Sequence, residues 1–422
     1  MIIRTNIFCT AVLIITLTVI TAAAGDWPDW HGPDRTNKSK ETGLLKQWPK
    51  EGPALLWTAK GLGDGYSTVS TFGGTIYTAG VVDNMNYVFA FDLGGKLLWR
   101  TPAGGVWEAT RAFARAYRGS RATPVVNDGM VYYLSDTGLL VALDAKTGAQ
   151  RWSLNIREKY NAAMPEYGYS ESPLIVGRLY VAAYGKKAGA LCLDKKTGKV
   201  IWESAPKATT ANRGDPAYTS FIWAENSGYR QLISFSSTHV YGIDSETGRY
   251  LWTVPMHNSR DNNCADVIFH DGHVFASTGY GIGSKLIKLE PKGKSDVSAT
   301  VVYETKLMDN HHGGLVLHEG HVYGAGHESA GWFCLDFKTG QQKWRQAGKG
   351  SMTFADGMLY MYDEKGTMSL VKATPSAFTP VSSFEVPSGN MKSHFWARPV
   401  VSNGVLYVRY ADHLYAYDIK AK

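Results

Sequence analysis

The stretch Leu143-Asp144-Ala145-Lys146-Thr147-Gly148-Ala149-Gln150-Arg151-Trp152 reads as the end of one strand, a tight turn and the start of a second strand. Asp144 favours the turn because its short side chain can bond the backbone two residues further on. Gly148 adopts the positive φ that closes a hairpin without steric cost. Trp152 is large and apolar enough to anchor the returning strand by packing. The stretch therefore predicts a β-hairpin.

This hairpin pattern recurs along the chain at a nearly constant interval. Good copies begin at Phe91, Leu193, Ile243 and Leu335. Each copy ends on an aromatic residue, with Tyr303 and Phe384 standing where the tryptophan is lost. The full series is Trp57, Trp99, Trp152, Trp202, Trp252, Tyr303, Trp344 and Phe384. A spacing of about 40 to 50 residues indicates a repeat architecture.

The earlier half of each period predicts two more strands. Pro124–Tyr132 is an apolar run, a turn with Asp and Gly, and a second apolar run. The same arrangement recurs at Pro173–Tyr180, Val267–Phe275 and Pro399–Tyr407. Runs rich in Val, Ile, Leu and Tyr that are split by turn residues are typical of strands. Each period thus holds four strands, here called A to D.

Four strands per period and eight periods predict an all-β fold, an eight-bladed β-propeller of four-stranded antiparallel blades. Ala397–Ile419 provides strands A, B and C of a blade but no strand D. Pro53–Trp57 provides a strand D with no strands before it. We expect these two segments to form one blade, because this pairing closes the ring and leaves no open edge between the chain ends.

The N-terminal 24 residues differ from the rest and predict a Sec-type signal peptide. Arg4 precedes the apolar run Ile7–Ile20, and Ala22-Ala23-Ala24 forms a small-residue cleavage site. A membrane anchor is the alternative, although the run is short for a bilayer. No Cys stands at the cleavage point for a lipid anchor. We therefore expect a periplasmic or secreted protein without a transmembrane segment in the mature chain.

Between the predicted signal peptide and the propeller (residues 53–422) lies an aromatic-rich segment, residues 25–52. Its Trp27, Trp30 and Trp48, together with several prolines, predict an extended arm. We expect this arm to pack along the outside of the ring, with binding of a partner as the alternative.

Charge and cysteine content exclude several classes of function. The net charge is +7 and the basic residues are scattered over turns, so no nucleic-acid partner is expected. Cys192 and Cys334 hold the same repeat position in blades that are not neighbours, which places them beyond disulfide range. Both are expected to be buried free thiols. No cysteine spacing fits a zinc site.

Candidate site residues lie on one face of the predicted ring. The A–B and C–D turns share one rim and are short, whereas the B–C and D–A loops share the other and are long and varied. This second rim, called the irregular face below, is where function is expected. We expect its polar and aromatic residues to converge around the channel mouth: Arg121, Tyr169, Asn262, Tyr280, Asp309, Asn310, His311, His312, His327, Trp396 and Arg398.

The densest polar cluster is Asp309-Asn310-His311-His312-Gly313-Gly314. In extended backbone His311 and His312 would point to opposite sides, so they cannot chelate one metal as a simple pair. A metal site would need His327 or His257 to converge on one of them. A hydrogen-bonded structural pair of histidines is the alternative, and we assign no metal ligand.

The repeat strand-Ala/Cys-Leu-Asp-x-x-Thr-Gly-x-x-x-Trp resembles the pyrroloquinoline-quinone (PQQ) repeat of quinoprotein dehydrogenases and of BamB-like propellers. The N-terminal Asp26–Pro33 and the cluster Asp309–Gly314 look like segments of secreted PQQ-like propellers of environmental bacteria. The resemblance implies an eight-bladed propeller outside the cytoplasm. The chain departs from the dehydrogenases because it has no adjacent cysteine pair, no Cys-x-x-Cys-His haem motif and no calcium ligand set that can be matched. The lipobox Cys of BamB is also absent.

Two functions follow from this resemblance. The first is a non-catalytic propeller that binds a small polar ligand or an envelope protein through its irregular face. The alternative is a PQQ-dependent oxidoreductase acting on an alcohol or a sugar, with PQQ and calcium as cofactors. In the alternative, Asp309 or His312 would be the catalytic base, and Trp396, Arg398 and Arg121 would hold the quinone.

Overall fold

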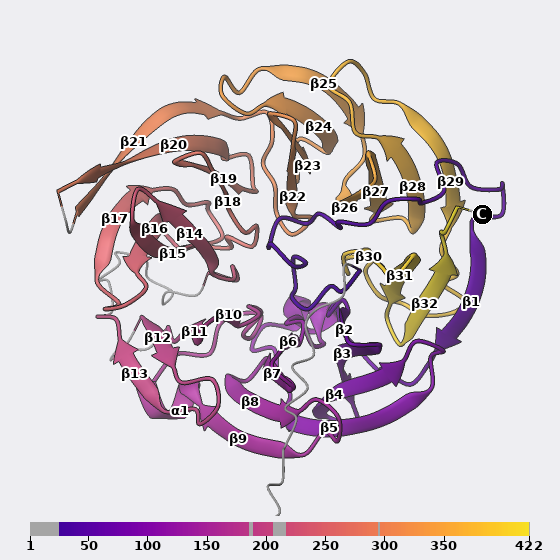
Figure 1. Cartoon of the computed structure of the whole chain (residues 1–422), viewed down its shortest axis with the longest axis horizontal. Coiled ribbons are helices and arrows are strands. Elements are labelled where there is room, and N and C mark those ends of the chain that lie inside the picture. Colours follow the sequence, from indigo (N-terminus) through magenta and orange to yellow (C-terminus); the bar gives the residue numbers. More distant parts are fainter. Residues whose placement is uncertain (1–24, 185–188, 206–216, 294–295, 422) are drawn as a thin grey trace, which may run out of the picture.

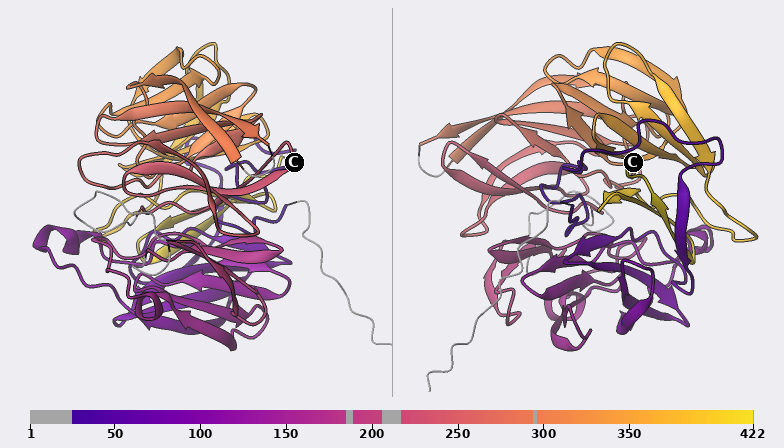
Figure 2. Two further views of the ribbon diagram at one scale, coloured as in Figure 1. Left: turned by 90° about the vertical axis from the view of Figure 1, so that its left-hand side faces the viewer. Right: turned by 45° about the vertical axis from the view of Figure 1, so that its right-hand side comes forward.

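Eight four-stranded antiparallel sheets form a ring around a central channel, so the predicted eight-bladed β-propeller is confirmed (Figure 1; side views in Figure 2). The computed structural model describes residues 25–184, 189–205, 217–293 and 296–421. The predicted signal peptide lies outside these residues, as do Arg213 and Asp215 of one D–A loop.

The first half of the ring consists of blades 1 to 4. Blade 1 contains β2 (Ser70–Phe72), β3 (Thr75–Val82), β4 (Met85–Asp92) and β5 (Leu97–Gly105). Blade 2 contains β6 (Val125–Asn127), β7 (Met130–Leu134), β8 (Leu139–Asp144) and β9 (Gln150–Asn155). Blade 3 contains β10 (Leu174–Val176), β11 (Arg178–Ala182), β12 (Ala190–Leu193) and β13 (Val200–Glu203). Blade 4 contains β14 (Ile222–Asn226), β15 (Tyr229–Phe235), β16 (His239–Asp244) and β17 (Tyr250–Pro255).

Blades 5 to 8 complete the ring. Blade 5 contains β18 (Ile268–His270), β19 (His273–Thr278), β20 (Gly283–Lys292) and β21 (Asp296–Thr305). Blade 6 contains β22 (Leu315–His318), β23 (His321–Ala325), β24 (Gly331–Asp336) and β25 (Gln342–Ala347). Blade 7 contains β26 (Gly350–Ala355), β27 (Met358–Asp363), β28 (Thr367–Lys372) and β29 (Pro380–Glu385). Blade 8 contains β30 (Val400–Ser402), β31 (Val405–Tyr410), β32 (His413–Asp418) and β1 (Ala54–Ala59).

The repeated turn has the geometry that its sequence predicts. Asp144 Oδ1 accepts hydrogen bonds from Lys146 N at 3.1 Å, Thr147 N at 2.9 Å and Thr147 Oγ1 at 2.9 Å. Gly148 has φ +71°, and a Cβ there would meet the ring of Trp99 in the preceding blade at 2.6 Å. Glycine is therefore required both for the backbone and for close contact between blades.

The strand D aromatic residues join each blade to the next one. Trp152 Nε1 donates to Lys195 O at 3.0 Å, so the indole of blade 2 bonds the C–D turn of blade 3. The same bond from strand D to the next blade is made by Trp57, Trp99, Trp202, Tyr303 and Trp344. Trp252 differs, because its Nε1 donates within its own blade to Gln231 Oε1 at 2.7 Å. The repeat sequence thus encodes the blade and also the contact between blades.

The ring is closed by the two ends of the chain, as predicted. Strand β1 pairs antiparallel with β32, with Ala54 opposite Asp418 and Trp57 opposite Ala416. Trp57 Nε1 then donates to Leu93 O of blade 1 at 2.8 Å. The first strand therefore serves as the outer strand of the last blade, and no edge remains open at this junction.

The N-terminal arm does not lie along the outside of the ring, and that expectation was wrong. Residues 26–40 cross the centre of the ring, where the indigo trace runs over the channel in Figure 1. Trp27 pairs with Thr71 of β2, and Lys38 pairs with Phe354 of β26. The arm takes this path because the innermost strands present backbone groups at the axis that no further strand pairs. Only the later part passes over blade 7, where Trp48 packs on Tyr360.

The remaining features agree with a turn-rich β protein. Two short helices occur in D–A loops, η1 (Ala112–Tyr117) and α1 (Ile156–Tyr160). Among the residues described, neither helix is long and apolar enough to cross a bilayer. Cys192 and Cys334 are free and buried in blades 3 and 6, as predicted.

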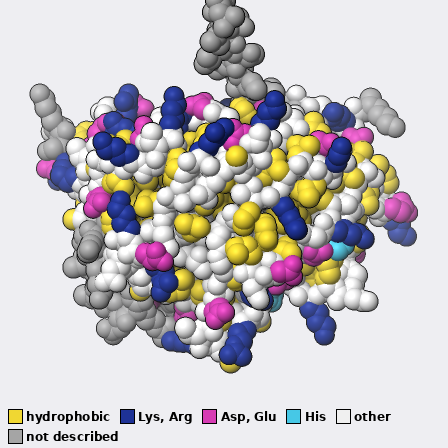
Figure 3. All heavy atoms as spheres, turned by 90° about the horizontal axis from the view of Figure 1, so that it is seen from below, with side chains coloured by type: hydrophobic (Ala, Val, Ile, Leu, Met, Phe, Trp, Pro, Cys, Tyr) yellow, Lys and Arg dark blue, Asp and Glu magenta, His cyan; other side chains and the backbone are white. Residues whose placement is uncertain are grey.

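The outer surface of the ring mixes apolar and charged side chains. Leucines of β1 and β5 and of the turn before β5 are exposed, namely Leu55, Leu56, Leu93, Leu97 and Leu98. Figure 3 views the edge of the ring that is lowest in Figure 1, and there Lys and Arg alternate with Asp and Glu. No long basic stripe crosses this face.

Candidate functional site: an axial cavity on the irregular face

A cavity of about 580 Å³ lies on the channel axis and opens on the irregular face. Every lining residue except Trp30 belongs to a D–A or B–C loop, which confirms that the irregular loops converge there. The lining residues are Trp30, Tyr66, Arg111, Phe113, Tyr117, Arg121, Glu166, Tyr167, Ser170, Tyr218, Ser220, Arg260, Asn262, Cys264, Tyr280, His311, His312, His327, Lys349, Glu364 and Trp396.

One wall of the cavity is a stack of aromatic rings. Trp396 lies nearly parallel to Tyr117, with ring centroids 5.5 Å apart and an angle of 12° between the planes. His394 stacks on Trp396 at 4.3 Å, and Tyr66 lies 5.2 Å from the same indole. Helix η1 brings Tyr117 to this wall and leaves Phe113 at the mouth, 52% exposed. The wall offers flat apolar faces to a ligand.

Histidines and a tyrosine continue the lining from the aromatic wall, since the ring of His312 lies 4.8 Å from that of Trp396. The rings of His311 and His327 are 4.7 Å apart, and Tyr280 lies 4.8 Å from His327. His311 and His312 do not point to opposite sides, because the backbone bends at His312, and their Nδ1 atoms are 3.0 Å apart. The expectation from extended backbone was therefore wrong for this pair.

The histidines of the cavity are neutral at physiological pH. Burial, followed by the charges of His327 and Lys349, lowers the pKa of His311 to about 3. Burial also holds the pKa of His312 well below its ordinary value, and it lowers that of His327. Uncharged imidazoles can donate or accept hydrogen bonds but add no charge to the cavity.

The cations of the cavity outnumber its carboxylates. Arg111 pairs with Glu166 at 3.1 Å, and Lys349 pairs with Glu364 at 3.1 Å. His312 Nε2 also lies 3.3 Å from Glu364. Both carboxylates of the lining are therefore engaged, whereas the lining cations Arg121 and Arg260 have no carboxylate contact among the described residues.

Arg121 contributes positive charge from inside the wall. Its guanidinium lies 5.7 Å from the ring centre of Tyr66 and 5.4 Å from that of Trp107. It also donates to the carbonyls of Gly119 and Tyr117. Burial lowers the pKa of Arg121, but an arginine remains charged near neutral pH.

Asp309 and Asn310 are buried beneath the cavity surface and are not among its lining residues. Asp309 accepts hydrogen bonds from Ser329 Oγ at 2.7 Å and from three backbone amides, those of Gly281, Glu328 and Ser329. Although burial opposes it, these bonds hold the pKa of Asp309 below its ordinary value. Asn310 Nδ2 donates to Ala325 O at 2.7 Å. Both side chains thus fasten loops of blades 5 and 6.

Two further expected residues lie outside the lining. Tyr169 is buried in a hydrophobic cluster with Tyr132 and Leu179, because its loop turns the ring toward blade 3. Arg398 is buried below the floor, with its guanidinium 4.0 Å from the ring centre of Trp30. The expected residues that do line the cavity are Arg121, Asn262, Tyr280, His311, His312, His327 and Trp396.

Several lining residues were not selected from the sequence. Trp30 was missed because the arm was expected outside the ring. Lys349 and Glu364 lie in short loops that were not selected from the sequence. Tyr66 and Tyr117 lie in loops that were assigned to the irregular face, where aromatic content was the available signal.

The described residues contain no group of three His, Cys, Asp or Glu side chains arranged to hold a metal ion. His311 and His327 converge, but Glu364 is occupied by Lys349 and His312.

Fold and cavity together define an eight-bladed propeller with a small-molecule-sized chamber on its axis. Residues 54–346 match the family model described as outer membrane protein assembly factor BamB, whose repeat is the PQQ repeat. Since this match covers more than half of the chain, the protein belongs to this family.

Relatives with curated descriptions include quinoprotein dehydrogenases, a serine/threonine-protein kinase and BamB. Quinoprotein ethanol dehydrogenase from Pseudomonas putida is 30% identical over 147 residues, which cover 33% of this chain and 23% of that protein. Outer membrane protein assembly factor BamB from Yersinia pestis is 22% identical over 256 residues, which cover 56% of this chain and 59% of that protein. The matched region spans about a quarter of the length of the dehydrogenase.

Solved structures share the fold at low sequence identity. BamB from Moraxella catarrhalis superposes with a TM-score of 0.60 at 13% identity, covering 87% of this chain and all of that one. Quinohemoprotein alcohol dehydrogenase from Comamonas testosteroni gives a TM-score of 0.65 at 12% identity, covering 95% of this chain and 82% of that one. At these identities the likeness concerns the fold alone.

Proposed function

We propose that this protein is a non-catalytic propeller that binds a small, planar, anionic molecule in the axial cavity. The observation that carries the proposal is the composition of the lining, which combines flat aromatic faces with four cations and only two carboxylates, both already paired. The ligand enters from the irregular face.

The aromatic wall favours a planar ligand. Trp396 and Tyr117 present parallel ring planes, against which a conjugated molecule stacks with dispersion and quadrupole attraction. A cavity of about 580 Å³ is within the range of small-molecule sites. These features favour a small ligand over a protein partner for this site.

The charge of the lining favours an anion. Arg260 is exposed at the cavity and its guanidinium has no partner among the described residues, while Arg121 bonds only neutral carbonyls. Charge-assisted bonds from such groups are stronger in a partly dehydrated site than in water. Neutral histidines leave the net charge of the lining positive.

The carboxylates argue against catalysis by a general base. Asp309 is saturated by four hydrogen bonds and does not reach the cavity, so it is unsuited to the role expected of it in a dehydrogenase. The depressed pKa of His312 makes this imidazole a weak base. A binding protein therefore accounts for the lining better than an enzyme.

A PQQ-dependent oxidoreductase is the second candidate, and the relatives described as quinoproteins favour it. The lining fits the planar tricarboxylate, because Trp396 and Tyr117 could stack on its rings while Arg121 and Arg260 meet its carboxylates. When bound, PQQ would supply a redox-active quinone. For calcium, the described residues contain no group of three His, Cys, Asp or Glu side chains arranged to hold the ion.

Titration calorimetry with PQQ, with and without calcium, tests the proposal. We expect binding that does not depend on calcium and a loss of about tenfold in affinity for Arg260→Ala, the effect of about 1.4 kcal/mol from one charged contact. Arg230→Ala is the matched control, because Arg230 is exposed on the opposite rim and pairs with Glu225. Equal affinities of both variants would contradict the site. Alcohol oxidation by the PQQ-loaded protein would replace this proposal by the second candidate.

We also propose that the protein works outside the cytoplasm. The support is the predicted signal peptide together with the family, which is that of an outer membrane protein assembly factor. N-terminal sequencing of the protein recovered from a periplasmic extract should begin near Gly25. An intact Met1 in the cytosolic fraction would contradict it.

A further inference from the structure

The arm residues 27–39 bond the innermost part of every blade. Trp27 N and O pair with Thr71 of blade 1 at 3.0 and 2.8 Å. Pro28 O accepts from Val126 N of blade 2 at 2.8 Å, and Phe354 N of blade 7 donates to Asn37 O at 2.9 Å. The arm therefore occupies the far end of the channel, opposite the irregular face.

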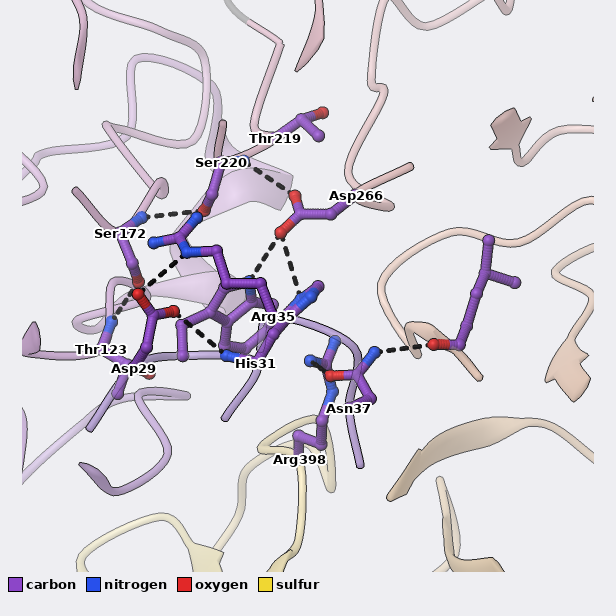
Figure 4. Close-up of polar contacts among 12 residues, drawn as sticks. Asp29, His31, Arg35, Asn37, Thr123, Ser172, Thr219, Ser220, Asp266 and Arg398 are labelled. Atoms are coloured by element: carbon purple, nitrogen blue, oxygen red, sulfur yellow. Dashed lines mark hydrogen bonds and ion pairs between the residues drawn. The ribbon is translucent and has the colours of Figure 1, made fainter. Parts of the chain in front are cut away.

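Arm side chains reach the remaining blades. Arg35 donates to the carbonyls of Pro173 in blade 3 and Phe221 in blade 4. Asn37 Nδ2 donates to Leu315 O of blade 6 at 2.8 Å, and its Oδ1 accepts from Arg398 beside blade 8. Figure 4 shows Arg35, Asn37 and Arg398 among the polar contacts of this region.

Blade 5 receives the arm through a buried carboxylate. Asp266 Oδ2 accepts from Trp30 Nε1 at 2.8 Å and lies 3.1 Å from His31 Nε2. Its other oxygen accepts from Ser220 N at 2.8 Å. The Asp29–Arg35 pair at 2.9 Å completes a set in which each buried charge has a polar partner. Such a set requires the arm to be seated in one position.

Trp30 and Ser220 are the members of this polar set that line the cavity. Trp30 is the one arm residue among the lining residues, and Arg398, on the other side of the indole, does not line the cavity. The indole is therefore held between the guanidinium below it and the open space above. Its ring is fixed by the bond to Asp266 and by His31, whose centroid lies 4.7 Å away.

We propose that the N-terminal arm is a plug that seals the channel and that Trp30 is the positioning residue that forms the floor on which the ligand rests. The cavity then has a single mouth and a fixed depth only while the arm is seated. The statement about the ligand rests on the proposed function, whereas the statement about the plug does not.

The cavity thiol provides a direct test of the plug. Cys264 lines the cavity, and burial raises its pKa to about 12, so a small neutral reagent such as methyl methanethiosulfonate should modify it slowly. Cys192 and Cys334 are buried and serve as internal references in peptide mass spectrometry. We expect Trp30→Ala to accelerate modification of Cys264 at least fivefold, because reagent and water enter through the opened floor.

Trp48→Ala is the matched control, since Trp48 belongs to the same arm but packs on Tyr360 and Phe384 away from the cavity. It should leave the Cys264 rate unchanged. The plug proposal would be overturned if Cys264 were modified at the wild-type rate in Trp30→Ala. It would also be overturned if Trp30→Ala and Trp48→Ala accelerated this modification equally. Trp30→Phe keeps an aromatic floor and should fall between wild type and Trp30→Ala.

Ligand binding is tested in the same variants with PQQ as the probe. We expect Trp30→Ala to weaken binding at least tenfold and Trp48→Ala to leave it within twofold. If wild type binds no PQQ, the ligand assignment fails while the thiol rates still decide the plug. If wild type binds and Trp30→Ala binds equally well, the floor assignment fails.

Hydrogen exchange of the wild-type protein tests the plug without any variant. The amides of Trp27, Asn37 and Ser39 are bonded to Thr71 O, His31 O and Phe354 O. A seated arm should protect them as strongly as strand amides in the blades, at least a hundredfold above free exchange. Exchange of these amides at the free rate would overturn the proposal even if Trp30→Ala failed to fold.

Discussion

Replacing Asp309 by Ala should destabilise the protein strongly, although the residue stands in a loop that was selected as a site for ligand binding. The carboxylate accepts from Gly281 N at 3.0 Å, Glu328 N at 2.9 Å, Ser329 N at 3.2 Å and Ser329 Oγ at 2.7 Å. Alanine would leave three backbone donors without this acceptor in a buried place. Each such donor costs roughly 1–3 kcal/mol.

Partial access of water reduces this cost, so we expect a loss of about 3–6 kcal/mol in the free energy of unfolding. That is a large share of the stability of an ordinary domain, about 5–15 kcal/mol. The wild-type carboxylate contributes stability above the pKa of the unfolded chain, about 3.9, because its folded-state pKa is lowered. The difference in free energy of unfolding between wild type and Asp309→Ala should therefore shrink as the pH falls below about 4.

Urea unfolding followed by tryptophan fluorescence measures the loss, and Asp194→Ala is the matched control. Asp194 also accepts three hydrogen bonds, from Lys196 N, Thr197 N and Thr197 Oγ1, but in a solvated turn. Water replaces the lost acceptor there, so we expect a loss of about 1 kcal/mol. Hydrogen exchange should accelerate at Gly281 and Ser329 in Asp309→Ala alone.

The reasoning would be refuted if the two variants lost the same stability. It would also be refuted if Asp309→Ala kept wild-type stability and lost only ligand binding, because Asp309 would then be a contact residue. The substitution affects stability although the strand ladders do not use this side chain, because the loops of blades 5 and 6 do.

The remaining predictions concern closure, thiols and pH. Trp57→Ala should lower the melting temperature by several degrees in calorimetry, because it removes the contact of the closing strand with Leu93; an unchanged temperature would contradict the closure. Cys192 and Cys334 should resist a thiol reagent until urea unfolds the chain, and a disulfide between them found by mass spectrometry would contradict the blade assignment. Burial raises the pKa of Asp266 to about 6, so the stability that it gives is present below about pH 4 and lost as the pH rises through about 6. Between about pH 5 and about pH 7.5 the free energy of unfolding of wild type should fall by about 1.5 kcal/mol relative to that of Asp266→Asn, as measured by urea unfolding at each pH.

The sequence predicted the fold in detail because the features that build a blade are local. Asp144, Thr147 and Gly148 form the turn within a few residues of one another. The contact between blades also depends on residues of the repeated hairpin. The turn glycine of one blade packs on the strand D aromatic residue of the preceding blade. A single copy of this hairpin pattern predicts the fold only weakly, and its recurrence along the chain makes the prediction strong.

The sequence predicted the face of the ring on which the cavity opens, but it did not predict which side chains line the cavity. Strand order places the D–A and B–C loops on one rim, and that part was right. The direction of each side chain within a loop depends on contacts with other blades, which no local pattern records. Tyr169 and Tyr167 are two residues apart, yet the first is buried in blade packing and the second lines the cavity.

The arm was misplaced for a related reason. Tryptophan and proline in an extended segment predict that it packs, but they do not say on which surface. The determining residues, Arg35 and Asn37, bond carbonyls of blades 3, 4 and 6, which are distant in sequence. When a polar side chain bonds backbone groups that are distant in sequence, the residues next to it in the sequence do not indicate that contact.

The same physics explains why Asp309 and Asn310 of the densest polar cluster are structural, whereas His311 and His312 of that cluster line the cavity. The innermost strands of this propeller are short, with three residues in β2, β6 and β18, so the loops that lead into them carry many backbone groups without strand partners. Buried groups of this kind must be bonded, and Asp309 and Asn310 bond them. Polar side chains are therefore frequent near the axis because the buried backbone groups of these loops need hydrogen-bond partners. The proposed ligand contact is instead made by a side chain such as that of Arg260, which is exposed at the cavity and bonds no backbone group of the described loops.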